Sequence, residues 1–316
     1  NYVGDRQPNI EEVTIRFIGD PLAAVTALEN GEVDVISPQA TTDVVAGLEA
    51  IEGVEIITGL EGTYEHVDLQ ITNSRNPGVF EDQRVREAFL KTIPRQQIVE
   101  TLIAPIIGDD ALVRNSFVFV PGAEGYDDSV ANNGSGAYDE VDIEGAQALL
   151  AEAGVTNPEV CLLYASNNPR RVNEFALIQE SAALAGFNVT DCGSEQWGGL
   201  LGTAGAYDAS LFGWQSTGLG VTDSGPTFQT GEINNLNFYS NAEVDELFNE
   251  LYRTFEPADQ IELLQQIDSL LWADAYGTTI FQFPSVTGVS DRVTGVDPSI
   301  IAPTIFWNVW DWEIAE

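Results

Sequence analysis

The side chains with the clearest binding chemistry lie at the end of one predicted strand. Residues 207–213 read as a strand, and Phe212, Gly213, Trp214 and Gln215 follow one another at its end. A glycine beside aromatic residues lets backbone amides and carbonyls approach a ligand closely, while the indole supplies an apolar wall. A tryptophan in this position is also common in a hydrophobic core, so Trp214 could serve either purpose.

A second candidate lies in a predicted strand-to-helix loop. Asn167, Asn168 and Pro169 precede Arg170 and Arg171 there. The guanidinium fork suits bidentate pairing with a carboxylate, so the two arginines could clamp a carboxyl group of a ligand. They could also simply open a surface helix, although basic residues in the first turn of a helix are disfavoured by its dipole.

Catalytic and metal-binding patterns are not found in this sequence. His66 is the only histidine, and no nucleophile signature such as Gly-x-Ser-x-Gly lies beside it. The cysteine and histidine spacing that zinc requires and the EF-hand pattern of calcium sites are also missing. We therefore expect a protein that is not an enzyme and that needs no metal or other cofactor.

Composition limits the partners further. The chain has 316 residues, 44% of them hydrophobic, with 50 acidic and 12 basic side chains and a net charge of −38. A phosphate backbone selects lysine and arginine patches, so nucleic acid is not an expected partner, and anionic lipid is disfavoured for the same reason. No apolar run approaches the roughly 20 residues that cross a bilayer.

The spacing of apolar residues predicts the scaffold that positions these groups. From residue 142 onward, helices and short strands alternate, which indicates an α/β domain with right-handed crossovers and a parallel sheet. Ligands of such sheets bind beyond the carboxyl ends of the strands. Three loops should therefore surround one binding mouth: residues 166–171, 193–197 and 213–217.

Other segments give simpler predictions. Alternating apolar residues predict a strand over 13–18, and helical spacing predicts helices over 242–254 and 257–273. Residues 121–139 hold several glycines, Asp and Asn but few aliphatic residues, which predicts a surface loop.

The segment Phe80–Phe89 combines a helix start with a family signature. Asp82 can cap a helix while Val85 and Phe89 recur on one face. The sequence Phe-Glu-Asp-Gln-Arg-Val-Arg-Glu-Ala-Phe resembles a segment of the extracellular solute-binding proteins of family 5, the oligopeptide and dipeptide receptors of ABC importers. Further resemblances follow in the same order along the chain, at Tyr2–Gly4, Ala27–Val35, Ala146–Gly154, Gly205–Trp214 and Asn235–Asp245.

The resemblance implies a fold and a function. The fold would be α/β and periplasmic-binding-protein-like (type II), with one complete lobe around a mostly parallel central sheet and part of the other lobe. The protein would be the substrate-binding component of an ABC importer, capturing peptides or another small solute in the interlobe cleft and delivering them to a membrane permease. The alternatives are a ligand-sensing receptor of the same fold and a binder of an oligosaccharide or a metal chelate.

The resemblance also implies lobes and a location. Residues 1–71 and 283–316 would belong to lobe I, and residues 72–282 would form lobe II. Family members are longer, so we expect the N-terminal portion of lobe I, and any lipid anchor, to lie outside these 316 residues. The protein would be extracellular or part of the cell envelope, either periplasmic or anchored at the outer face of the cytoplasmic membrane.

Two tryptophans match ligand-contacting positions of the family. Trp197 matches one that lines side-chain pockets, and Trp214 follows a glycine in a stretch that pairs with an extended peptide as an added strand. Peptide-binding members carry an aspartate three residues later, which neutralises the ligand's α-amino group, whereas this chain has Thr217. Asp223 is either its displaced equivalent or an ordinary turn residue.

Cys161 and Cys192 are the only cysteines, and they fall on two predicted neighbouring strands, 160–165 and 187–192. An even count in a protein that resembles exported receptors favours one disulfide. Two buried thiols are the alternative, because a disulfide needs a short distance between α-carbons and strand register cannot be read from the sequence.

Overall fold

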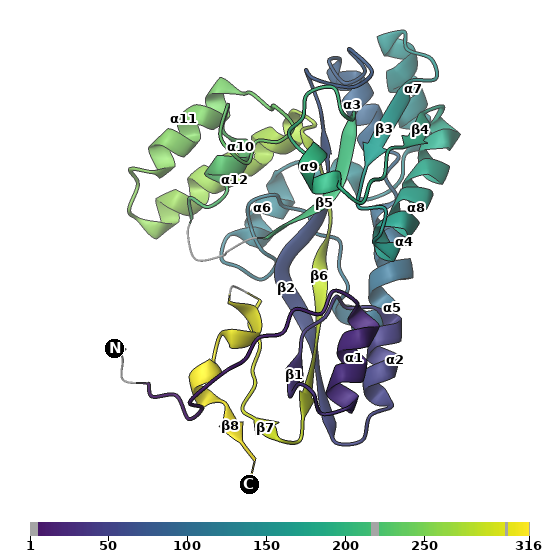
Figure 1. The fold of residues 1–316 in the computed structure, drawn as a ribbon. Coiled ribbons are helices and arrows are strands. Elements are labelled where there is room, and N and C mark those ends of the chain that lie inside the picture. Colours follow the sequence, from purple (N-terminus) through teal and green to yellow (C-terminus); the bar gives the residue numbers. More distant parts are fainter. Residues whose placement is uncertain (1–5, 216–220, 301–302, 316) are drawn as a thin grey trace. The chain divides into compact units, whose positions relative to one another are not determined.

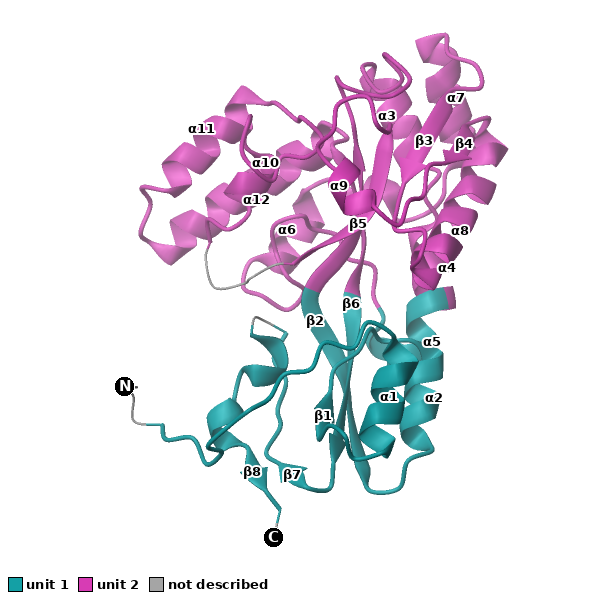
Figure 2. Cartoon of the chain, in the orientation of Figure 1, with its two compact units in different colours: residues 1–62, 102–111, 283–316 teal, residues 63–101, 112–282 magenta. Residues whose placement is uncertain are grey.

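The computed structural model describes residues 6–215, 221–300 and 303–315. Its two units, each built from separate stretches of the chain, are coloured in Figure 2. Unit 1 comprises Asn1–Gly62, Leu102–Ala111 and Phe283–Glu316, and unit 2 comprises Thr63–Thr101 and Leu112–Gln282. The divisions at 62/63 and 282/283 each fall within a long strand.

The main sheet has six strands in the order β1-β6-β2-β5-β3-β4 (Figure 1). They are β1 Val35–Ile36, β2 Val54–Leu69, β3 Glu159–Leu163, β4 Asn188–Asp191, β5 Ala209–Gln215 and β6 Gly277–Ser290. β3 is parallel to β4 and to β5, as predicted. The sheet as a whole is mixed rather than mostly parallel, because β2 joins β5 in antiparallel register and β1 joins β6 in the same way.

Unit 1 holds α1 (Pro21–Glu29), α2 (Thr42–Glu49) and α5 (Ala104–Ile107), with a small antiparallel ladder of β7 (Val293–Thr294) and β8 (Glu313–Ile314). The Asp20 carboxylate caps α1 by accepting hydrogen bonds from the next turn. Side chains of α1, β1, the loop before α2, α2 and β6 form its core: Ala24, Val25, Leu28, Ile36, Ala40, Val44, Leu48 and Val286.

Residues 13–18 do not form the predicted strand. They belong to no strand in the described part of the chain. Their alternating apolar side chains are exposed, with Val13 45%, Ile15 59% and Phe17 97% accessible. The alternation that suggested a strand is therefore present, but no neighbouring strand pairs with the segment and covers its apolar face.

Unit 2 carries most of the helices. They are α3 Gln83–Leu90, α4 Arg95–Ile98, α6 Tyr126–Asn132, α7 Ile143–Ala153, α8 Pro169–Ala185, α9 Trp197–Leu200, α10 Gly225–Phe228, α11 Ala242–Leu251 and α12 Pro257–Ala273. Within this unit α7 packs against α3 and α8, α8 packs against β4, and α12 packs against α6 and α11. No helix in the described ranges is long and apolar enough to cross a membrane.

The predicted surface loop at 121–139 is wrong, because it contains α6 and a 3₁₀ turn over Ser135–Tyr138. Ser129 Oγ and Asn133 Nδ2 both donate hydrogen bonds to Asp268 Oδ2 on α12, at 2.8 Å each. Two polar residues of this stretch thus bind a buried carboxylate instead of facing solvent.

The first and the last residue of unit 2 are joined by a hydrogen bond. Gln282, the last residue of the unit, donates a hydrogen bond from its Nε2 to the carbonyl oxygen of Thr63, the first residue, at 3.0 Å. Both residues stand on strands that continue into unit 1 (Figure 1).

Candidate functional site

The C-terminal end of β5 has one edge without a strand partner in the described chain. β5 pairs with β2 over its whole length, up to Gln215 opposite Thr63, but it pairs with β3 only as far as Ser210. Among the described residues, no strand therefore lies beside 211–215 on the β3 side. An edge of this kind can accept an extended peptide through main-chain hydrogen bonds.

Three aromatic rings lie beside this edge. The ring centroids of Trp197 and Phe212 are 6.2 Å apart, and those of Phe212 and Trp214 are 5.7 Å apart. Phe212 is buried, whereas both tryptophans are only half-buried and keep accessible ring surface. The indole nitrogen of Trp214 has no hydrogen-bond partner within the ranges that the structure describes. The structure therefore brings Phe212, Trp214 and Trp197 together.

The predicted loops after β3 and β4 also lie side by side. Ala165 and Ser194 form a parallel bridge, and the Ser166 backbone N–H donates to the Ser194 carbonyl oxygen at 3.3 Å. Asn167 is exposed at this point. The Asn168 side chain caps α8, where its Oδ1 accepts a hydrogen bond from the Arg170 backbone N–H at 3.1 Å.

Arg170 and Arg171 are buried, and both guanidinium groups contact Glu65 on β2. Arg170 Nη2 lies 2.8 Å from Glu65 Oε2, and Arg171 Nε lies 3.1 Å from Glu65 Oε1. Arg170 Nε also pairs with Glu174 Oε1 at 3.1 Å, one helical turn later. Each arginine thus has an internal carboxylate in the position where a ligand's carboxylate was predicted.

The Glu174 carboxyl group has a raised pKa. Burial, and next the repulsion from the Glu65 carboxylate, raise the pKa of Glu174 to about 8, although both arginines oppose the shift. Its Oε2 has no hydrogen-bond partner among the described residues. Glu65 and Glu174 were not among the predicted residues, although the four-residue spacing of Arg170 and Glu174 on a helix indicates an ion pair.

The remaining residues considered for ligand contact lie at the end of β5 and in the segment that follows it. Thr217 lies outside the described residues. Asp223 is exposed in the turn before α10, and Gln215 is exposed at the end of β5.

The predicted disulfide between Cys161 and Cys192 is confirmed; it joins β3 to the residue that follows β4. A buried carboxylate that the sequence analysis missed supports the same region. Asp208 Oδ2 accepts hydrogen bonds from the Cys161 backbone N–H and the Asn76 side chain, both at 2.7 Å. Burial raises the pKa of Asp208, and these hydrogen bonds oppose the shift.

His66 is buried in strand β2. Its ring lies edge-on to Phe212 with a centroid distance of 4.3 Å, and its Nε2 is 3.4 Å from Asp68 Oδ2. Within the described ranges no group of three or more His, Cys, Asp or Glu side chains could hold a metal ion.

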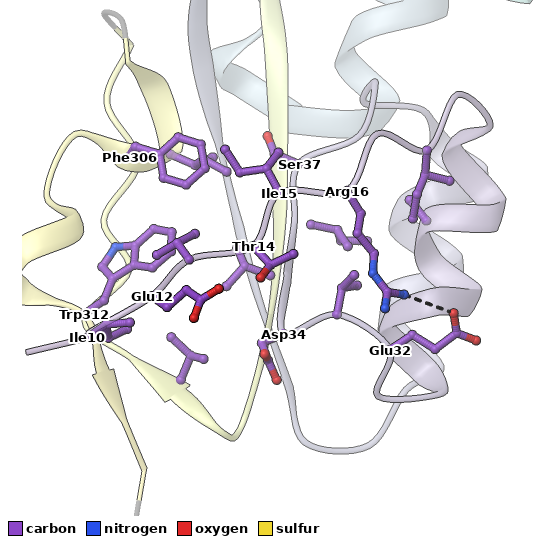
Figure 3. A pocket seen from close by; sticks show the side chains of 18 of the residues that line it. Ile10, Glu12, Thr14, Ile15, Arg16, Glu32, Asp34, Ser37, Phe306 and Trp312 are labelled. Carbon is purple, nitrogen blue, oxygen red and sulfur yellow. Dashed lines mark ion pairs between the residues drawn. The ribbon is translucent and has the colours of Figure 1, made fainter.

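Unit 1 contains a separate groove of about 560 Å³ (Figure 3). The extended residues 10–18 line one part of it, and residues 32–38 around β1 line another. Phe306 and Trp312 add aromatic surface, and Arg16 pairs with Glu32 at 3.5 Å. This groove contains none of the residues predicted to bind the ligand.

The sequence matches the family model of bacterial extracellular solute-binding proteins, family 5 (middle), over residues 1–235. The oligopeptide-binding protein OppA of Mycobacterium tuberculosis (strain ATCC 25618 / H37Rv) is 22% identical over 290 residues, 90% of this chain and 48% of OppA. The glutathione-binding protein GsiB of Escherichia coli (strain K12) is 24% identical over 306 residues, 91% of this chain and 55% of GsiB. The chain spans about half the length of these curated relatives.

Solved structures show the same fold. The periplasmic EDTA-binding protein EppA superposes with a TM-score of 0.89 at 21% identity, over 100% of this chain and 60% of EppA. AppA from Bacillus subtilis, in complex with a nonapeptide, superposes with a TM-score of 0.73 at 20% identity, over 95% of this chain and 59% of AppA. The predicted periplasmic-binding-protein-like (type II) fold is confirmed.

Proposed function

The chain belongs to the bacterial extracellular solute-binding proteins of family 5, and on that premise we propose that it is the substrate-binding component of an ABC importer. It would capture a peptide or another small solute outside the cytoplasmic membrane and deliver it to a membrane permease. Binding and release would need no chemical step.

The unpaired edge of β5 is the observation that supports this proposal most directly. Main-chain hydrogen bonds to such an edge hold an extended ligand without reading its side chains. Trp197 and Trp214 stand beside the edge and supply apolar contact. We propose that Phe212, Gly213, Trp214 and Gln215 form one wall of the site, with Trp197, Asn167 and Asn168 around it.

The names of the similar proteins span several kinds of solute. They include an oligopeptide, glutathione and EDTA, and each of these carries carboxylate groups. We therefore propose a solute with at least one carboxylate and a hydrogen-bonding backbone, most simply a peptide. Asp223 would contact its amino group if the cargo is a free peptide.

Mass spectrometry of whatever co-purifies with the chain identifies the solute. The solute is then added back, and backbone hydrogen exchange is followed along β5. We expect slower exchange for residues 211–215 and little change in β4, because the ligand pairs with the open edge. The Trp214→Ala variant should bind about tenfold or more weakly.

A matched control is Phe255→Ala, which removes an aromatic side chain that is 86% exposed elsewhere in unit 2. It should bind the solute like the unchanged chain. Protection of the unit 1 groove instead of residues 211–215 would contradict the proposed site.

A further inference from the structure

Trp197 lies between a hydrophobic cluster and a charged side chain. It packs against buried Cys161, Leu163 and Tyr207. The guanidinium carbon of Arg171 lies 5.1 Å from the centroid of its indole ring. A cation at this distance from a ring face is attracted by the ring quadrupole, and the attraction grows when both groups are shielded from water.

Arg171 is in turn held by Glu65. Its Nε and Nη2 donate to the two carboxylate oxygens of Glu65, at 3.1 and 3.5 Å. Arg171 is 7% accessible and Glu65 is fully buried, so little water competes for either group. The position of the guanidinium group under the indole therefore depends on a carboxylate that comes from another element.

Glu65 also stands next to the open edge of β5. In the β2–β5 ladder it is the register partner of Gly213. One carboxylate thus connects the strand that carries the proposed backbone contacts to the arginine that contacts the proposed aromatic wall.

We propose that Glu65 and Arg171 are positioning residues for Trp197, which they hold in place before any solute binds. Only the benefit of this arrangement rests on the proposed function: an indole that is already ordered lowers the entropic cost of binding a solute. Arg171 then contributes through the position of the indole, and Glu65 occupies the place that a ligand's carboxylate would need.

Glu174 provides a matched control within the same ionic network. It pairs with Arg170 at 3.1 Å, is fully buried like Glu65, and has no ion pair with Arg171 in the described structure. Glu65→Gln and Glu174→Gln therefore replace the same type of side chain at two fully buried positions. Only the first change touches the residue under the indole.

The test uses the full 316-residue chain without any solute. Nitrogen-15-labelled protein gives one indole N–H resonance for each of its 6 tryptophans, and Trp197→Phe identifies the resonance of Trp197. We expect Glu65→Gln and Arg171→Met to shift or broaden this resonance, while Glu174→Gln leaves it in place. Arg171→Lys keeps a cation near the ring and should bring the resonance back toward its original position.

Circular dichroism shows whether each variant is folded, and Arg171→Lys is the variant to rely on if Glu65→Gln does not fold. An unmoved Trp197 resonance in folded Glu65→Gln or Arg171→Met, or an equal shift in Glu174→Gln, would overturn the positioning role. A resonance in Arg171→Lys as displaced as in Arg171→Met would overturn it as well. Because no solute is added, none of these results depends on the proposed function.

Discussion

Asp268 Oδ1 accepts a hydrogen bond from the backbone N–H of Phe117 at 2.9 Å, across 151 residues of sequence. Its other oxygen accepts from Ser129 Oγ and Asn133 Nδ2. A single buried carboxylate on α12 therefore holds both a loop and a helix. This arrangement lets the polar stretch before α7 pack inside unit 2.

We expect Asp268→Ala to lower the free energy of unfolding by about 3 kcal/mol or more, because three buried donors lose their acceptor and each unsatisfied group costs about 1–3 kcal/mol. Urea denaturation measures the loss. Asp259→Ala, at an exposed position of the same helix, serves as control and should cost less than about 1 kcal/mol. Equal losses in both variants would show that the carboxylate has no special role.

Reducing the disulfide should lower the free energy of unfolding by about 3 kcal/mol, because Cys161 and Cys192 close a loop with a sequence separation of 31. Urea denaturation with and without a reductant measures this loss. A double variant, Cys161→Ala with Cys192→Ala, should already have the lower free energy of unfolding. Adding the reductant should not lower it further. Two thiols that react in the native, unreduced protein would contradict the prediction.

Glu174 should make the protein less stable as the pH rises. Its pKa is about 8 in the folded chain against an ordinary value of 4.5, so between these values the folded state keeps a proton that the unfolded state releases. The free energy of unfolding should therefore fall as the pH rises from about 5 to 8, by at most about 1.4 kcal/mol per pH unit from this group.

Glu174→Gln carries no ionisable group and should flatten this pH dependence. Denaturation curves of both proteins at pH 5, 6, 7 and 8 give the difference directly. Glu180→Gln, at an exposed position of α8, controls for the change of side chain in that helix. A stability difference that grows in favour of the unchanged chain with rising pH would refute the raised pKa.

Phe17, which is 97% accessible, should drive self-association rather than folding. Ile15, two residues earlier, is 59% accessible and lines the unit 1 groove (Figure 3), so the segment exposes more than one large apolar side chain. We expect Phe17→Ser to reduce association in sedimentation experiments while changing the free energy of unfolding by about 0.5 kcal/mol or less. Phe255→Ser tests whether any exposed phenylalanine has the same effect. A large loss of stability in Phe17→Ser would mean that its ring is packed.

Local patterns predicted the elements that depend on local forces. Helix α12 has the predicted limits, Pro257–Ala273, because proline at its first position and regular apolar spacing are readable in the sequence. Helix α6 could not be predicted, since distant Asp268 binds its polar residues. The mixed sheet was missed because the direction in which β2 pairs with β5 is not encoded in the residues of either strand.

The candidate site was also predictable only in part from the sequence. The aromatic and glycine residues at the end of β5 could be selected by type, and the parallel strands β3 and β4 explain why the following loops are neighbours. Glu65 could not be selected, because an acidic residue within a strand normally faces solvent. Glu65 is 105 residues away from Arg170 in the sequence. Only the structure shows that Glu65 Oε2 and Arg170 Nη2 lie 2.8 Å apart.

The hydrogen bond between Gln282 and Thr63 makes the stretch from 63 to 282 a natural cassette for protein engineering. A segment whose two ends touch can be inserted into a loop of another protein, or given new termini, without stretching its own backbone. Residues 102–111, which belong to unit 1, are the portion that a short linker would have to replace. A reporter joined through these two ends would respond to changes within the unit that contains the β5 edge.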